Sequence, residues 1–282
     1  QATAMGIAML STSVGAAIVP FAATWLMGEY GWRAGAALLS AGVWVIALPM
    51  MIFFLTDQSF EDHSERATAV HTEAASFDRD LAMRFASTPA FWLILFAVFA
   101  AGFVDQAFIQ HQVLYLREDL GLTPTIVATA VGAIGLLGIV ARPLVGSLFD
   151  GLSNRGVALS YVVLAVACLL ALAAVNPYVL SIFVLCRAIG HSAVLLDTLV
   201  LAKHTFGLRH IGILLGIYTA AVNIGFAAGP PVVARLHSLT GSYLVPFVAC
   251  TGIALLSALA LLPVRPAQWL LIRAGDKRSA FR

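Results

Sequence analysis

The sequence predicts an all-α protein that crosses a membrane several times. Of its 282 residues, 61% are hydrophobic and 11% are charged, whereas an average soluble domain carries about 25% charge. The apolar residues form long runs, each close to the roughly 20 residues that a helix needs to span a bilayer. Runs this long and uniform do not fit the strands of a membrane barrel. Helices, which pair their own backbone polar groups, are therefore the predicted spanning elements.

Eight such segments can be distinguished in order along the chain. They lie near residues 4–27, 32–55, 90–115, 125–148, 156–175, 178–202, 211–235 and 243–263. We interpret residues 1–55 as two helices of one bundle, 56–89 as a polar central loop, 90–263 as a six-helix bundle and 264–282 as a polar tail. The cysteines lie inside apolar segments, which indicates small core residues rather than a disulfide framework or a metal site.

The basic residues gather on one side of the predicted membrane. The 56–89 loop, the turns at 149–155 and 203–210 and the tail together hold eleven of the sixteen Lys and Arg residues. The opposite side holds Arg33, Arg117 and Arg235. Because cytoplasmic loops are rich in Lys and Arg, we expect the first side, and with it the C-terminal tail, to be cytoplasmic. The expected location is the inner or plasma membrane.

A glycine-proline pattern occurs twice, with an offset of 210 residues. The first copy is Gly6, Gly15, Pro20, Gly31 and Gly42, and the second is Gly216, Gly225, Pro230, Gly241 and Gly252. Internal repeats of helices are typical of secondary transporters. The offset spans six predicted helices, so the chain is expected to hold the last two helices of one repeat and all six of the next. Four helices would then precede Gln1.

Several motifs resemble those of the major facilitator superfamily. The stretches Gly6–Pro20 and Gly216–Pro230 resemble its fifth-helix motif and the echo of that motif. The turn Gly146–Arg155 resembles its cytoplasmic loop motif, although Gly151, Ser153 and Asn154 depart from it. Arg187-Ala-Ile-Gly190 resembles its tenth-helix motif. The resemblance covers nearly the whole chain and implies the fifth to twelfth helices of that bundle fold.

Other stretches resemble the monocarboxylate-transporter-like branch. They are Ser87–Trp92, His111–Tyr115, Ala141–Pro143, Phe206–Gly216, Gly229–Pro231 and Thr240–Tyr243. In that family an arginine at the position of Arg142 binds the substrate carboxylate, and an aspartate normally lies four residues earlier. Gly138 occupies that position here, so the family's proton-coupling pair is not reproduced.

Four ionisable residues lie deep in apolar segments: Asp105, Arg142, Arg187 and Asp197. Each costs about 2.5–3.5 kcal/mol to insert, so an intramembrane charge suggests a function. Arg142 shares a helix face with Gly132, Gly135, Gly138 and Gly146. We expect it to bind a substrate carboxylate, with an ion pair to Asp105 or Asp197 as the alternative.

Further residues are candidates for proton coupling, substrate contact or gating. Asp105 is a candidate for the coupled proton, or the structural partner of Arg142. His111 lines the outer mouth of a cavity or satisfies a helix interface, while Asn223 and Tyr218 offer substrate contacts or helix packing. Arg187 and Asp197 are structural or pathway charges. Asp150 and Arg155 are expected to latch a gate, and Gly225, Gly229 and Pro230 to let a helix pack closely and bend.

These observations predict a secondary transporter of a small organic anion, of the monocarboxylate kind and coupled to protons, and not an enzyme. An exporter or antiporter of another solute is the alternative. An intramembrane protease, using Asp105 with Asp197 or using Ser192, and a non-transporting sensor are more remote, because the expected motif frames are missing. The sequence shows no nucleotide loop, metal cluster or nucleic-acid surface. No cofactor and no obligatory protein partner are expected; the partners are the solute, protons and lipid.

Overall fold

The computed structural model describes residues 10–54, 85–207 and 211–264. The chain divides into two units, Gly15–Thr88 and the remainder. In the first unit the described element is α2, which runs from Leu10 to Phe54 and is interrupted at Gly31 (φ 76°, ψ 164°). Two helices therefore meet at Gly31, where the sequence predicts the boundary between its first two spanning segments.

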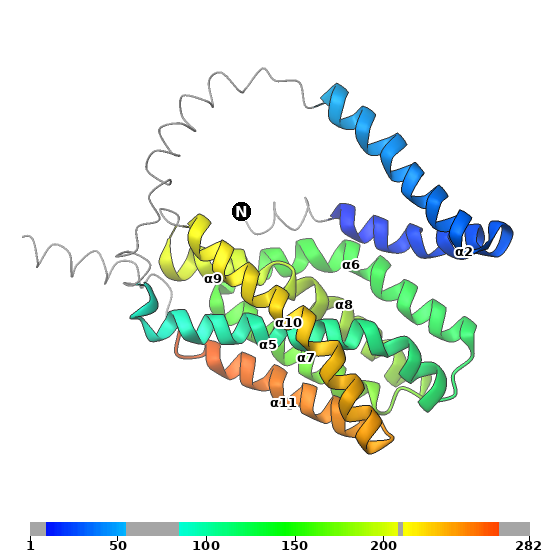
Figure 1. Ribbon diagram of the computed structural model, residues 1–282. Helices are drawn as coiled ribbons and strands as arrows, with labels where there is room; N and C mark the ends of the chain where they lie inside the picture. Colours follow the sequence, from blue (N-terminus) through cyan, green and yellow to red (C-terminus); the bar gives the residue numbers. More distant parts are fainter. Residues whose placement is uncertain (1–9, 55–84, 208–210, 265–282) are drawn as a thin grey trace, which may run out of the picture. The chain divides into compact units, whose positions relative to one another are not determined.

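The second unit is a bundle of long helices (Figure 1). They are α5 (Pro89–Leu114), the π-helical turn η1 (Tyr115–Asp119), α6 (Pro124–Leu152), α7 (Asn154–Ala171), α8 (Pro177–Val194), α9 (Asp197–Phe206), α10 (Ile211–Thr240) and α11 (Leu244–Leu261). Six helices in the described chain are long and apolar enough to cross a membrane, with η1 counted as the end of the first. These helices lie between Pro89 and Leu261.

Local sequence signals begin two of these helices. Thr123 caps α6, because its hydroxyl accepts a hydrogen bond from the main-chain nitrogen of Ile126, and Pro124 follows at the first helical position. Asn176 caps α8 in the same way, accepting from the nitrogen of Tyr178 ahead of Pro177. A capping side chain followed by proline satisfies or removes the free N–H groups at a helix start.

The repeat in the sequence has a counterpart in the backbone. Gly31 and Gly241, which occupy equivalent positions of the two copies, both adopt positive φ angles, 76° and 67°. A residue with a Cβ atom rarely adopts this conformation, so glycine is needed at each helix-to-helix turn. Gly42 and Gly252, also equivalent, both have open space where a Cβ atom would lie.

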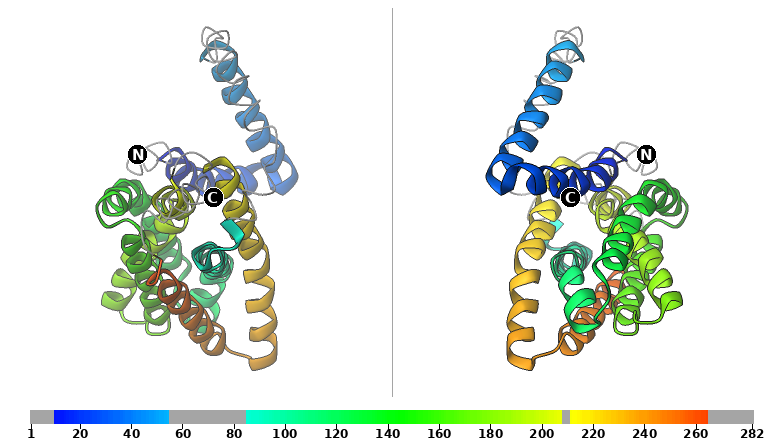
Figure 2. Two further views of the ribbon diagram at one scale, coloured as in Figure 1. Left: turned by 90° about the vertical axis from the view of Figure 1, so that its left-hand side faces the viewer. Right: turned by 90° about the vertical axis from the view of Figure 1, so that its right-hand side faces the viewer.

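α5 is the central helix of the bundle, packed against α10 and α11 (Figure 2). α7 packs against α8 and α11, and α8 also packs against α6. The contact between α5 and α10 is unusually close, because a Cβ atom on Gly225 or Gly229 would lie 2.2 Å from the carbonyl oxygen of Phe99 or Phe103. Small residues let helix backbones approach where lipid offers no hydrophobic driving force.

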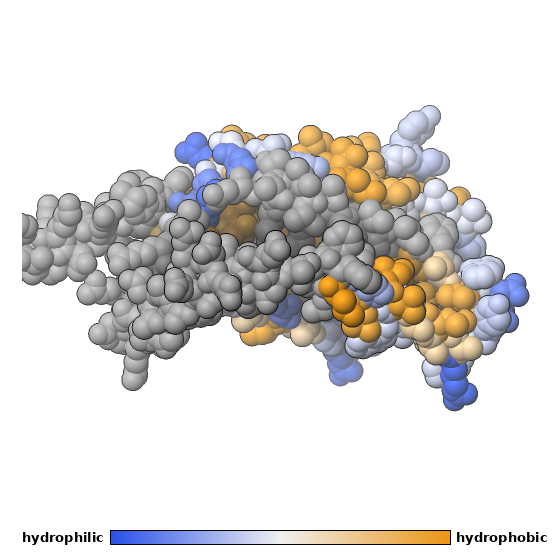
Figure 3. Space-filling view, turned by 90° about the horizontal axis from the view of Figure 1, so that it is seen from above, coloured by the Kyte–Doolittle hydropathy of each residue, from blue (hydrophilic) through white to orange (hydrophobic). Residues whose placement is uncertain are grey.

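The outward faces of the helices are apolar. On α6 the exposed residues include Leu136, Val140 and Leu144, four residues apart on one face. Hydrophobic side chains are also visible on the described surface in Figure 3. An apolar surface of this kind suits a lipid environment.

One predicted helix is wrong in the described bundle. The segment 178–202 is not continuous, because α8 ends at Val194 and α9 begins at Asp197. The main-chain nitrogen of Leu196 donates to the oxygen of Ala193, three residues back, which tightens the turn and ends the α-helical ladder. Because the residues at the break are apolar and include no glycine or proline, the sequence reads as one helix.

Candidate functional site

The four ionisable residues expected inside the membrane are all buried in the bundle. Asp105, Arg142, Arg187 and Asp197 are between 0% and 3% exposed. They come from different helices: α5, α6, α8 and the first residue of α9. A charge that is buried away from water is costly unless it is paired, so the role of each of these residues depends on its partners.

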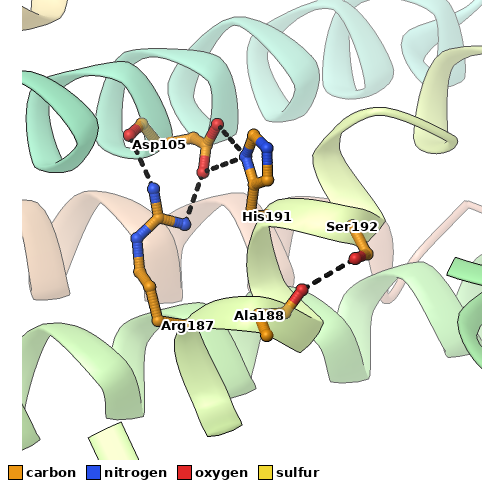
Figure 4. Close-up of polar contacts among 5 residues, drawn as sticks. All are labelled: Asp105, Arg187, Ala188, His191 and Ser192. Carbon is orange, nitrogen blue, oxygen red and sulfur yellow. Dashed lines mark hydrogen bonds and ion pairs between the residues drawn. The ribbon is translucent and has the colours of Figure 1, made fainter. Parts of the chain in front are cut away.

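Asp105 lies in a cluster with Arg187 and His191 (Figure 4). The Nη1 atom of Arg187 donates to Oδ1 of Asp105 at 2.6 Å, and its Nη2 atom donates to the main-chain oxygen of Asp105 at 3.1 Å. The Nδ1 atom of His191 lies 2.9 Å from Oδ2 of the same carboxylate. Arg187 and His191 are one turn apart on α8 and reach across to α5, so the cluster joins the two helices.

The carboxylate fixes which nitrogen of His191 carries hydrogen. An ionised carboxylate accepts hydrogen bonds and cannot donate them. Nδ1 of His191 therefore carries a hydrogen atom and donates it to Asp105. Side-chain exposure is 0% for Asp105 but 26% for His191, so the ring is the accessible member of this pair.

The ion pair of Asp105 corrects one sequence expectation. The sequence offers Arg142 as one possible structural partner of Asp105, whereas the salt bridge is formed with Arg187. Both arginines interrupt apolar helices, and the sequence does not say which one faces α5. The sequence feature that bears on this pairing is the one-turn spacing of Arg187 and His191, which places both on one face of their helix.

Asp197 has a different partner. The hydroxyl of Tyr161, on α7, donates a hydrogen bond to Oδ2 of Asp197 at 2.5 Å. The break before α9 places Asp197 in the first turn of that helix, where the helix dipole favours a carboxylate. Tyr161 was not singled out in the sequence, because it lies 36 residues away and looks like an ordinary apolar-segment aromatic.

The described contacts do not support a protease site. A carboxylate dyad shares a proton between two adjacent acids, whereas Asp105 is bound to Arg187 and Asp197 to Tyr161. Ser192, the other candidate nucleophile, donates its hydroxyl hydrogen to the carbonyl of Ala188 on its own helix (Figure 4). The hydroxyl is therefore engaged in a local helix contact.

His111 occupies a helix interface. Its Nδ1 atom lies 3.0 Å from the hydroxyl of Tyr243, and its Nε2 atom lies 3.1 Å from the carbonyl of Pro230. Burial, with the nearby carboxylates of Asp119 and Glu118, raises the pKa of Tyr243, so its hydroxyl stays available as a donor. Both ring nitrogens of His111 are thus used within the protein, which favours the interface role over the cavity-mouth role.

The two candidates on α10 differ in environment. Tyr218 is fully buried, its ring lies 5.7 Å from that of Phe91, and its hydroxyl has no hydrogen-bond partner among the described residues. Asn223 is exposed and donates its side-chain amide to the carbonyl of Thr219, one turn earlier. The structure does not bring these two side chains together.

The glycine face of α6 is buried around its arginine. Gly138, Arg142 and Gly146, spaced four residues apart, are all buried. α6 packs against α8, the helix of Arg187 and His191. The helix remains continuous through Pro143.

A comparison with known protein families identifies the family of this chain. The sequence model of the Major Facilitator Superfamily matches residues 1–194, more than half of the chain. The chain belongs to the Major Facilitator Superfamily. It is accordingly a multi-pass membrane protein and a secondary transporter in general terms. No curated protein matches the chain at a significant level.

The loop motif of the superfamily lies at the turn between α6 and α7. Asp150 and Arg155, the expected latch residues, are exposed there. Ser153, with a φ of 53°, places its hydroxyl 3.1 Å from Nδ1 of His204, and Asn154 donates to the hydroxyl of Thr205 at 3.0 Å. Two of the three residues that depart from the expected motif, Ser153 and Asn154, therefore tie the turn to the end of α9, which the sequence does not show.

The stretch expected to be the second glycine-proline motif lies in α10. Gly225 and Gly229 contact the backbone of α5, as expected for close packing. Gly216, in the same copy of the repeat, has open space at its Cβ position. The carbonyl of Pro230 meets His111. Within the described bundle, the close approach is thus confined to the middle of the helix.

Proposed function

We propose that this member of the superfamily transports a small organic anion by alternating access and is driven by a proton gradient. The observation that carries the proposal is Arg142, a guanidinium 3% exposed within an apolar spanning helix. Its burial is costly, and arginine binds a carboxylate through two parallel hydrogen bonds. Arg142 lies on the buried face of α6 with Gly138 and Gly146, and we assign it to the substrate.

The likeness to monocarboxylate transporters supports a monocarboxylate as the substrate. Arg142 stands between Ala141 and Pro143, as the carboxylate-binding arginine of that branch does. Gly138 replaces the branch's aspartate, so a coupled proton would need another residue of this chain. An exporter or antiporter using the same arginine is the second candidate, supported by the glycine-proline motif of α10.

We also propose an arrangement for the helices in the membrane. The glycine turns at Gly31 and Gly241 support two helices of one bundle followed by a six-helix bundle. The distribution of Lys and Arg supports a cytoplasmic C-terminal tail in an inner or plasma membrane. Substrate would then bind near the midplane of the membrane, as in other transporters built from repeats.

Uptake into vesicles tests this proposal. The full-length protein is reconstituted, and uptake of labelled lactate, pyruvate and oxalate is measured with and without an inward proton gradient. We expect gradient-stimulated uptake of at least one anion, and at least about a tenfold loss in Arg142→Gln, because a charge-assisted hydrogen bond is worth about 1.5–3 kcal/mol. The exposed Arg235, on α10, gives a matched control, Arg235→Gln, for removal of a positive charge.

The outcomes separate the parts of the proposal. Unchanged uptake in Arg142→Gln would make Arg142 structural. Uptake without gradient stimulation, but with faster exchange against internal anion, would favour the antiporter. No transport of any of the three anions would remove the preference for monocarboxylates.

A further inference from the structure

The partly exposed member of the buried cluster is the ring of His191. Nδ1 of the ring is bound to the carboxylate of Asp105. Within the described chain, no hydrogen bond is formed by Nε2, although the side chain is 26% exposed. In the neutral ring, Nε2 therefore has a lone pair that can accept a proton or a hydrogen bond.

The net charge of the cluster depends on whether Nε2 of His191 carries a proton. Arg187 is always positive, and the carboxylate of Asp105, 2.6 Å away, balances it. The cluster is then neutral when His191 is neutral and carries one positive charge when His191 is protonated. Imidazole is the side chain that gains and loses a proton near neutral pH. An anion would be attracted only to the protonated form.

Other ionisable groups lie on the helices that pack against α8. Asp105 faces the ring from α5, and Arg187 is its neighbour on α8. Cys168 on α7 and Asp197 in α9 interact electrostatically with Asp105, and Arg142 is the buried charge of α6. In the described contacts, Asp105 is the group that touches the ring of His191.

We propose that Nε2 of His191 binds the coupled proton and thereby creates the cationic N–H that binds the transported anion. This inference rests on the proposed function. A proton from water adds to the lone pair of Nε2, and both ring nitrogens then carry hydrogen. Nδ1–H stays on Asp105, and Nε2–H donates to a carboxylate oxygen of the substrate. Loss of this proton on the other side of the membrane removes the charge and releases the anion.

The proposal gives Asp105 a different task from the one expected. Its carboxylate is fully buried and held by Arg187, so it is a positioning residue that orients the ring and stabilises the imidazolium. Arg187 holds the carboxylate in place through its two donors. The proton moves on the other ring nitrogen, Nε2.

Two variants of His191 test the coupling in vesicles of the full-length protein, with labelled lactate, pyruvate and oxalate as probes. His191→Gln keeps a donor for Asp105 but has no proton to gain. We expect it to lose gradient-driven uptake by at least about tenfold, the worth of a charge-assisted hydrogen bond. His191→Lys carries a lasting positive charge, so exchange of external for internal anion should persist while a proton gradient no longer accelerates uptake. His237→Gln, a substitution near the end of α10, should behave as wild type.

A spectroscopic measurement tests the proton site without transport. Spectra of ¹⁵N-histidine-labelled full-length protein in detergent are compared with those of His191→Gln, whose missing signals identify His191. We expect hydrogen on Nδ1 alone in the neutral ring and on both Nδ1 and Nε2 in the protonated ring. In Asp105→Asn, the neutral tautomer should become mixed.

The results distinguish this inference from the proposed function. If wild type shows gradient-driven uptake and His191→Gln retains it, the proton site is refuted and the transport function stands. If wild type transports none of the probes but Nε2 takes up the proton, the proton site stands and the proposed substrate class fails. A neutral ring with hydrogen on Nε2, or a ring that gains no second proton under the conditions in which the protein transports, overturns the inference directly.

Discussion

The contact between α5 and α10 makes a specific prediction about glycine. A Cβ atom on Gly225 would lie 2.2 Å from the carbonyl oxygen of Phe99 and 2.9 Å from the nitrogen of Phe103. Both obstacles are backbone atoms of a neighbouring helix, so no side chain can rotate away to make room. Gly225→Ala must therefore push the two helices apart.

The magnitude follows from the geometry. Ordinary van der Waals contact begins near 3.4 Å, so the helices must separate locally by about 1 Å, and close packing across the seam is lost. Overpacking of this kind costs about 1–3 kcal/mol. Alanine is intrinsically a better helix former than glycine by about 1 kcal/mol. The same change at an open position should therefore be neutral or stabilising.

Thermal unfolding of the purified full-length protein measures the effect. Gly216→Ala and Gly252→Ala are matched controls, because nothing lies within 4 Å of their added Cβ atoms in the described structure. We expect Tm to be lower in Gly225→Ala than in either control, by about 2–4 °C for each kcal/mol. Gly229→Ala, which meets the carbonyl of Phe103 at 2.2 Å, should behave like Gly225→Ala.

The controls make the reasoning refutable. If Gly225→Ala is as stable as Gly216→Ala, the two helices do not approach as closely as the structure shows. If all four variants lose stability equally, glycine matters in these helices for a reason other than the seam. A loss confined to Gly225→Ala and Gly229→Ala would support backbone contact as the role of the repeated motif.

Three further predictions concern buried polar groups. Tyr161→Phe removes the donor to Asp197 and should lower the unfolding free energy by about 1–3 kcal/mol, read from Tm. Asp105→Asn and Arg187→Gln should each cost about 3–5 kcal/mol, because each strands one buried charge; a double-mutant cycle should show the double variant less destabilised than the sum. Burial lowers the pKa of His204 from its ordinary 6.5. The unfolded chain then binds more protons, so Tm should fall as the pH drops through that value, and His204→Gln should flatten the slope.

Each of these has its own control or contrary result. Tyr178 is 82% exposed, so Tyr178→Phe should leave Tm unchanged; an equal loss in both tyrosine variants would exclude a special contact with Asp197. Strict additivity in the cycle would mean that Asp105 and Arg187 are not coupled. An unaltered pH slope in His204→Gln would assign that slope to other groups.

Part of the candidate site could be predicted from the sequence. An ionisable residue within 20 apolar residues must be buried in a helix bundle, wherever its partner lies. That argument is local, and Asp105, Arg142, Arg187 and Asp197 are indeed buried. The spacing of Arg187 and His191 places them one turn apart on α8, but the partial exposure of the His191 ring depends on how α8 is turned toward α5.

The long-range contacts could not be predicted in this way. Asp105 and Arg187 are 82 residues apart, and Ser153 and His204 are 51 residues apart. Periodicity shows which residues share a helix face, but it does not show which helix that face meets. The same limit applies to Gly216 and Gly225, which share a repeat motif although only Gly225 touches another backbone.

By itself, the sequence determined that the chain is a set of apolar helices with glycine turns and a few intramembrane charges. Lipid requires long apolar helices, and a positive φ angle requires glycine, so both properties are written locally in the chain. Only the tertiary structure decided that Asp105 pairs with Arg187, that α8 and α9 are separate, and that the ring of His191 is partly exposed. These depend on helix-to-helix distances of a few ångströms, which are set by packing across the whole bundle.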